Sequence, residues 1–276
     1  MRSRWVSGQR VGGDALVRRI DLGGEGKMRE HRAAATTAGI LYFTGTVAGV
    51  LSVVVSAPLR DARDPLAYAV EHSGAMVTTG LLVLVMGLSL AFVPVVLFRV
   101  LRPINEVLAI GYLIVRGAIE TTCYVVVVIG WLLLVPIGEA LAAGEGTASP
   151  AGVRVGNLVI DADGANAVLA LVFCLGAAMF YVLLYRSRIV PRWISAWGLV
   201  AIPFYVADYL LLMYGVFDMN APAQVLMYLP LAVQEMVLAV WMIARGFRPA
   251  VVSAPSERVS RRPLEAEARL TIGSSE

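Results

Sequence analysis

The chain has 276 residues and a formal net charge of +3; 58% of the residues are hydrophobic and 16% are charged. The mean hydropathy of +0.75 exceeds that of ordinary soluble domains, in which about 45 to 50% of residues are apolar, and excludes a soluble fold. The basic residues lie beside apolar runs and are not interleaved with exposed aromatic residues, so no nucleic-acid partner is expected.

Residues 1–35 precede the first apolar run. They hold eight Lys and Arg residues among glycines and acids and lack sustained apolar periodicity, which predicts a basic, disordered tail. Met28 lies just before the apolar pattern begins. Residues 1–27 are therefore either a genuine segment or the product of a start site placed too early.

Six long apolar runs follow, each near the roughly 20 residues that a helix needs to cross a hydrocarbon core about 30 Å thick. They predict an all-α fold, a bundle of six transmembrane helices within 36–246. The first run is longer than the apolar region of a signal peptide and no cleavage site follows it, so a retained anchor is expected. The expected spans are 36–57, 72–98, 106–135, 165–185, 193–214 and 223–244.

Lys and Arg residues are divided unequally between the two sides of this topology. Nineteen fall in the two terminal segments and the two turns on the same side, whereas only Arg60, Arg63 and Arg154 fall on the other. Since positive charge accumulates on the cytoplasmic side, both termini are expected in the cytoplasm. Residues 247–276, rich in Arg, Glu, Ser and Pro, are expected to form a disordered cytoplasmic tail.

No cofactor is expected. The chain has two histidines, His31 and His72, which excludes a multi-histidine metal site, and it lacks nucleotide-binding, zinc-protease and nucleophile-elbow motifs. Cys123 and Cys174 lie within apolar runs, where they imply no disulfide framework.

Four ionisable residues interrupt the apolar spans: Arg116 and Glu120 in the third, Asp208 in the fifth and Glu235 in the sixth. The helix rise places Arg116 and Glu235 about 13 to 15 Å from the cytoplasmic end, and Glu120 and Asp208 about 21 to 22 Å from it. Arg116 and Glu120 are four residues apart and share one helix face, so they can pair.

These four residues are the candidate catalytic set, with Glu120, Asp208 and Glu235 as acids and Arg116 as their charge partner. One interpretation is that they only fasten the third, fifth and sixth spans together. The other starts from the excess of carboxyl groups over guanidinium, which implies that at least one carboxyl holds a proton. Glu120 and Asp208 are the expected carriers, and a neutral carboxylic acid in an apolar site can donate a proton.

Candidate ligand-binding residues lie around this level and at the outer mouth of the second span. Tyr205, Tyr209 and Tyr228 are expected either to line an apolar cavity or to serve as packing and interface anchors. Glu71 and His72 lie at the outer mouth, where interfacial water can solvate them.

Gly45 and Gly49 form a small-xxx-small pair in the first span. Such a pair allows close helix contact, either within the bundle or between two copies in a homodimer. Besides a second copy, the expected partners are membrane lipids and a lipophilic small molecule.

Several short segments, in this order and spacing, resemble the bacterial domain of unknown function 4386 family over roughly residues 30–246. The resemblance implies a multi-span protein of the bacterial plasma membrane and supplies no reaction. The segments are Arg32 to Tyr42, Leu101-Arg102-Pro103-Ile104-Asn105, Arg116 with Glu120, Tyr185-Arg186-Ser187 with Pro191-Arg192-Trp193, and Gln234-Glu235 through Arg245-Gly246.

Three functions remain open. The first is a membrane-embedded acid–base enzyme on an isoprenoid-like or other lipophilic substrate, by mechanistic analogy to terpene cyclases, although no cyclase motif is present. The second is a small proton-coupled transporter, against which the lack of an evident inverted repeat counts. The third is a non-catalytic partner or regulator, for which the charges of Arg116, Glu120 and Glu235 would satisfy one another completely.

Overall fold

The computed structural model describes residues 7–60, 62–144, 149–150, 154, 163–216 and 222–248. For residues 7–25, 27, 163–165 and 222–223 it describes the backbone alone. Within these ranges the chain is helical apart from short turns, and no strand occurs. The predicted all-α fold is confirmed.

Short connections join α1 to α2, α2 to α3, α3 to α4 and α7 to α8. Between α3 and α5, the π-helix η1 joins α4 to α5 without a break, so that the three form one span, Glu106–Ala143. The helices are α1 (Ser7–Arg60), α2 (Pro65–Glu71), α3 (Ser73–Leu101), α4 (Glu106–Ile114), η1 (Val115–Glu120), α5 (Thr121–Ala143), α7 (Asp163–Ser187), α8 (Arg192–Met213) and α9 (Pro222–Ala244).

In the part of the chain that the structure describes, six helices are long and apolar enough to cross a membrane, which confirms the six predicted spans. The predicted and observed ends differ by at most eight residues. The observed spans are Met28–Arg60, Ser73–Leu101, Glu106–Ala143, Asn166–Ser187, Arg192–Met213 and Gln224–Ala244.

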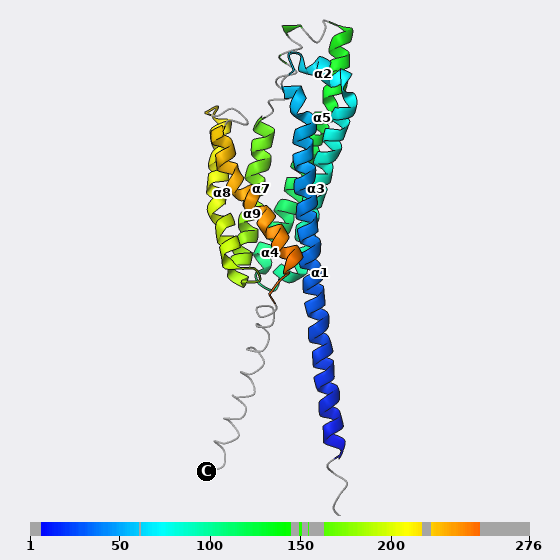
Figure 1. Ribbon diagram of the computed structural model, residues 1–276, viewed down its shortest axis with the longest axis vertical. Helices are drawn as coiled ribbons and strands as arrows, with labels where there is room; N and C mark the ends of the chain where they lie inside the picture. The colour runs from blue at the N-terminus through cyan, green and yellow to red at the C-terminus, as the bar shows by residue number, and fades with distance from the viewer. Residues whose placement is uncertain are drawn as a thin grey trace, which may run out of the picture.

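The first helix begins much earlier than its apolar run. The sequence predicts an irregular tail over residues 1–35, whereas α1 is helical from Ser7 and extends beyond the end of the bundle (Figure 1). No proline occurs before Pro58, so nothing interrupts the hydrogen bonds of the helix once its apolar part has formed. Residues 1–6 and 249–276, including most of the expected C-terminal tail, lie outside the described residues.

The helices form two groups that meet along the interior (Figure 1). In one group α3 contacts both α1 and α5, and in the other α8 contacts both α7 and α9. The tilted helix α9 reaches across to α1, and α4 and η1 contact α7. The third and sixth spans therefore both cross the seam between the groups.

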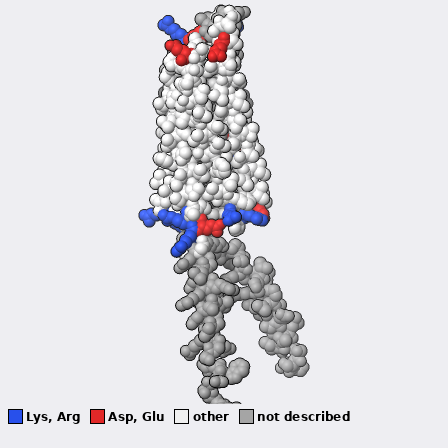
Figure 2. Space-filling view, turned by 90° about the vertical axis from the view of Figure 1, so that its right-hand side faces the viewer, with Lys and Arg blue, Asp and Glu red and all other residues white. Residues whose placement is uncertain are grey.

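The face of the bundle that Figure 2 shows is almost uncharged between the two ends. Large apolar side chains are exposed there, as expected for helices in contact with lipid rather than water. Charged residues gather at both ends of the bundle. The exposed basic residues of the lower end, which we call the arginine-rich end, include Arg32, Arg99, Arg102, Arg186, Arg188, Arg192, Arg245 and Arg248.

Glycines let α1 approach its neighbours closely. A Cβ atom on Gly45 would lie 3.1 Å from the Leu90 side chain, and one on Gly49 would lie 2.6 Å from that of Met86. Both glycines therefore face α3 of the same chain. Of the two roles that the small-xxx-small pair allows, the structure therefore places it in contact within the bundle. A Cβ on Gly39 would lie 2.7 Å from the Ala239 carbonyl oxygen on α9.

We expect Gly39→Ala to destabilise the protein by about 1–3 kcal/mol, because the added methyl group must displace the α9 backbone. Gly130→Ala is the matched control, since a Cβ there meets nothing within 4 Å. Alanine favours a helix over glycine by about 0.5–1 kcal/mol, so this control should be at least as stable as the wild type. Thermal unfolding in detergent micelles measures both; equal midpoints for the two variants would contradict the close approach.

Candidate functional site

A π-helical turn interrupts the third span at Val115–Glu120. At its start the Val115 N–H is shared between the carbonyls of Gly111 and Tyr112, and at its end the Thr121 hydroxyl donates to the Arg116 carbonyl over 3.3 Å. In such a turn the backbone hydrogen bonds join residues five apart instead of four, and π-helical turns occur frequently at functional sites. This one contains both Arg116 and Glu120, each 1% exposed.

Arg116 lies between two carboxyl groups from two spans. Its Nη1 is 3.6 Å from Oε2 of Glu120 in the same turn, and its Nη2 is 3.7 Å from Oε1 of Glu235 on α9. The side chains of Arg116 and Glu120 are 0% and 1% exposed, while that of Glu235 is 16% exposed. The three residues, called the acidic cluster below, join the third span to the sixth.

Two aromatic rings flank the guanidinium. Its Cζ lies 5.2 Å from the ring centroid of Tyr42 on α1 and 4.9 Å from that of Phe173 on α7. Desolvated contacts of this kind stabilise a cation by about 2 kcal/mol. One turn beyond Phe173, Gly176 brings the α7 backbone close to η1, since a Cβ there would lie 3.5 Å from that of Arg116. Four spans thus surround one charge.

The acidic cluster is paired in charge but incomplete in hydrogen bonding. Both ion pairs exceed hydrogen-bond length. Within the described residues, Nε, Nη1 and Nη2 of Arg116, both oxygens of Glu120 and Oε1 of Glu235 are buried without a hydrogen-bond partner. Buried polar groups usually have a protein or water partner. The carboxyl oxygens can therefore still accept a hydrogen bond or bind a proton, and the guanidinium can still donate.

Asp208 does not join this cluster. It is fully buried on α8, and both its oxygens lack a hydrogen-bond partner among the described residues. The sequence places Asp208 at the level of Glu120, but helix depth alone does not specify which face of α8 meets the third span. The structure brings Glu235 to Arg116, and links Asp208 by electrostatic proximity to its neighbour Tyr209.

Of the tyrosines predicted to bind a ligand, one contacts a ring beside Arg116 and the others lie further from it. Tyr205 packs on Phe173 with ring centroids 5.5 Å apart and on Tyr209 at 5.1 Å, so an aromatic row leads from α8 to the ring beside Arg116. Tyr228 is half-buried on α9, within electrostatic range of Tyr209.

Glu71 and His72 lie at the opposite end of the bundle from the arginine-rich end, where α2 meets α3 (Figure 1). Both are exposed. His72 stacks on Tyr68 with centroids 4.0 Å apart, and its Nδ1 is 3.1 Å from the Tyr68 carbonyl oxygen. The structure does not bring these two residues to the acidic cluster.

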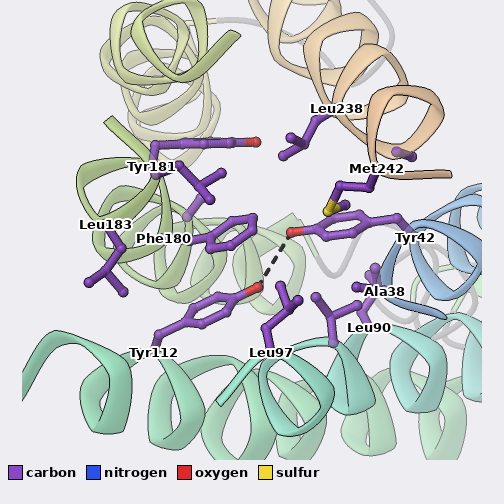
Figure 3. Packing of buried hydrophobic residues seen from close by; sticks show 14 of the residues in the cluster. Ala38, Tyr42, Leu90, Leu97, Tyr112, Phe180, Tyr181, Leu183, Leu238 and Met242 are labelled. Carbon is purple, nitrogen blue, oxygen red and sulfur yellow. Dashed lines mark hydrogen bonds between the residues drawn. The ribbon is translucent and has the colours of Figure 1, made fainter. Parts of the chain in front are cut away.

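The sequence did not predict the group of buried aromatic side chains that packs beside the site. Figure 3 shows Tyr42, Tyr112, Phe180 and Tyr181 packed between α1, α4, α7 and α9. The hydroxyl groups of Tyr42 and Tyr112 are 3.5 Å apart, and the Tyr112 and Phe180 rings stack at 4.8 Å. No sequence signal separates a tyrosine that packs beside a buried cation from one that anchors a helix in the interface.

Two further features concern metal ligands and cavities. Among the described residues, no group of three or more His, Cys, Asp or Glu side chains is placed to hold a metal ion. An apolar groove of about 240 Å³ between α1 and α3 contains none of the candidate site residues and is lined by Phe43, Thr44, Val47, Ala48, Leu51 and Leu82.

Arg116→Leu should destabilise the protein by roughly 3–5 kcal/mol, because it leaves Glu120 and Glu235 buried without their counter-charge. Adding Glu120→Gln and Glu235→Gln to the same protein removes that uncompensated charge and should restore much of the loss. Unfolding of the two variants in detergent micelles tests the pairing. A triple variant no more stable than Arg116→Leu would show that the carboxyl groups do not depend on the guanidinium.

Comparison with known proteins adds a family and no activity. No curated protein and no solved structure matches this chain. A family model, described as a domain of unknown function (DUF4386), matches residues 37–246, which include all six spans apart from the first residues of α1. The chain belongs to the DUF4386 family.

Proposed function

We propose that this protein is a membrane-embedded acid–base enzyme that acts on a lipophilic substrate, with Glu235 as its proton donor. The observation that supports the proposal is the sharing of one guanidinium by two carboxyl groups in the bundle interior. We further propose that it resides in the bacterial plasma membrane with its arginine-rich end in the cytoplasm, as the distribution of positive charge favours.

Charge balance indicates that the acidic cluster carries a proton. With both carboxyls ionised, the interior would hold one uncompensated negative charge, which is costly away from water. One proton shared between Glu120 and Glu235 makes the cluster neutral. Arg116 then compensates whichever carboxylate remains ionised, so the proton can leave and return without creating an isolated charge.

Exposure favours Glu235 as the group that meets a substrate. Glu120 is enclosed on every side, whereas the side chain of Glu235 is 16% exposed. The aromatic side chains of Tyr42 and Tyr181 lie within electrostatic range of Glu235, and such surroundings suit a hydrocarbon better than a charged solute. A purely structural ion pair is less well supported, because the guanidinium and Glu120 make no side-chain hydrogen bond within the described residues.

The chemistry that fits is proton transfer to and from carbon. Glu235 would protonate an alkene carbon or an epoxide oxygen, and the resulting cation would rearrange and return a proton from a neighbouring carbon to a carboxylate of the cluster. The net reaction is an isomerisation or cyclisation without an oxidant or reductant. General acid catalysis of this kind typically accelerates a reaction by about 10²–10⁴-fold.

The test does not require a known substrate. Membranes containing the protein are incubated in D₂O, and the extracted lipids are analysed by mass spectrometry for deuterium that does not exchange back in H₂O. We expect such carbon-bound deuterium with wild type, and a loss of about 100-fold or more with Glu235→Gln, as for a removed general acid.

Glu139→Gln is the control, because Glu139 is exposed at the end of α5 and should leave incorporation unchanged. Correct folding of each variant is checked by elution as a single species in detergent. Incorporation that persists in Glu235→Gln excludes Glu235 as the donor. The absence of incorporation with wild type, in membranes that contain isoprenoid alkenes, argues for the non-catalytic alternative.

A further inference from the structure

A second group of buried polar side chains lies between α7, α8 and α9, outside the acidic cluster. Tyr181, Ser195 and Gln234 come one from each helix, and each is 0% exposed. Among the described residues, the Ser195 hydroxyl and the Gln234 carbonyl oxygen have no hydrogen-bond partner, and the Tyr181 hydroxyl has none apart from the Gln234 side chain. Buried polar groups that lack partners at one helix junction are unusual in an apolar bundle.

Contacts place these side chains together. The Gln234 amide donates to the Ile194 carbonyl over 2.9 Å, which brings α9 to the first turn of α8, next to Ser195. One turn further on, Gly198 accepts the Tyr181 ring, since a Cβ there would lie 2.8 Å from it. Ser195 and Gly198 are three residues apart and share one face of α8.

The group connects two places of different character. Ser195 lies in the first turn of α8, which begins at the exposed Arg192 of the arginine-rich end. On its other side, Gln234 directly precedes Glu235. The Tyr181 hydroxyl lies beside the Gln234 side chain, whose amide can donate to it, and within electrostatic range of Glu235. In Figure 3 this hydroxyl points away from α7 towards α9.

The available groups specify the ligand class. Two hydroxyls can donate or accept, and the amide oxygen can accept, while none of the three carries a formal charge. Such a set suits a small neutral molecule that both donates and accepts hydrogen bonds. Buried water meets this requirement, typically with about three hydrogen bonds for each molecule.

We propose that Ser195, Gln234 and Tyr181 hold a path of water molecules from the arginine-rich end to Glu235, so that the acidic cluster exchanges protons with that side of the membrane only. The proposal rests on the proposed proton-carrying role of the cluster and adds the side from which the proton comes. These three residues position water and do not touch the substrate.

Cysteine accessibility tests the path. In a Cys123→Ala, Cys174→Ala background, Ser195→Cys and Gln234→Cys are exposed in sealed vesicles to 2-aminoethyl methanethiosulfonate on one side, with free cysteine as a scavenger on the other. Mass spectrometry of the intact protein measures labelling. A thiol must ionise to react, so labelling reports contact with water.

The matched controls are Leu238→Cys on α9 and Ala201→Cys on α8, whose native side chains are 0% and 2% exposed in apolar surroundings. We expect Ser195→Cys and Gln234→Cys to be labelled from the arginine-rich side at least about tenfold faster than these controls, because thiolate formation needs water. Labelling of Gln234→Cys from the opposite side, or no faster than Leu238→Cys, overturns the proposal.

A second measurement keeps the test decisive if Gln234→Cys does not fold. The infrared C=O band of the protonated carboxyl, assigned by its loss in Glu235→Gln, shifts when D₂O replaces H₂O. We expect this shift to slow by about tenfold or more in Ser195→Ala and Tyr181→Phe, since each removes one hydrogen-bonding group from the water path. An unchanged rate in both variants overturns the path. Labelling requires no turnover, so a failed path and a failed enzymatic function give different results.

Discussion

The guanidinium of Arg116 imposes the strongest constraint on this bundle, because a cation in hydrocarbon must be surrounded by groups that replace water. No single helix can supply them. Glu120 comes from the same turn, Glu235 from the sixth span, and the flanking rings of Tyr42 and Phe173 from the first and fourth. The contacts that neutralise one charge are therefore also contacts that hold four spans around the seam between the two helix groups.

At the arginine-rich end, a second arginine side chain joins α1 to the end of α9. Arg32 on α1 donates to the Arg245 and Ala244 carbonyls over 3.0 and 3.1 Å, and so satisfies carbonyl groups that the end of α9 leaves without a helical partner. Gly246 follows with φ of +66°, and a Cβ there would lie 2.7 Å from the Arg32 side chain. Together with Gly39, which lets α9 approach α1, this contact fixes the helix that carries Glu235.

The two buried polar groups have different characters that together suit proton handling. The acidic cluster holds the charges and lies beside the rings of Tyr42 and Phe173, whereas the neutral group at the α7, α8 and α9 junction includes Ser195 in the first turn of α8, at the arginine-rich end. Gln234 and Glu235 are consecutive residues on α9; Gln234 belongs to the neutral group and Glu235 to the acidic cluster. A single helix thus joins the proposed proton-binding site to the groups proposed to supply it, while the face of the bundle in Figure 2 is almost uncharged between its two ends.

The sequence alone determined the all-α class, the six spans and the four ionisable residues inside them, because hydrocarbon admits only long apolar helices and makes each exception conspicuous. The tertiary structure decided which exceptions meet. Glu235 rather than Asp208 joins Arg116, since depth along a helix follows from residue number, whereas the face that a helix turns towards its neighbour depends on packing between distant segments. The roles of Tyr42 and Phe173 were hidden for the same reason: an aromatic residue in an apolar run has no local feature that reveals the charge it will contact.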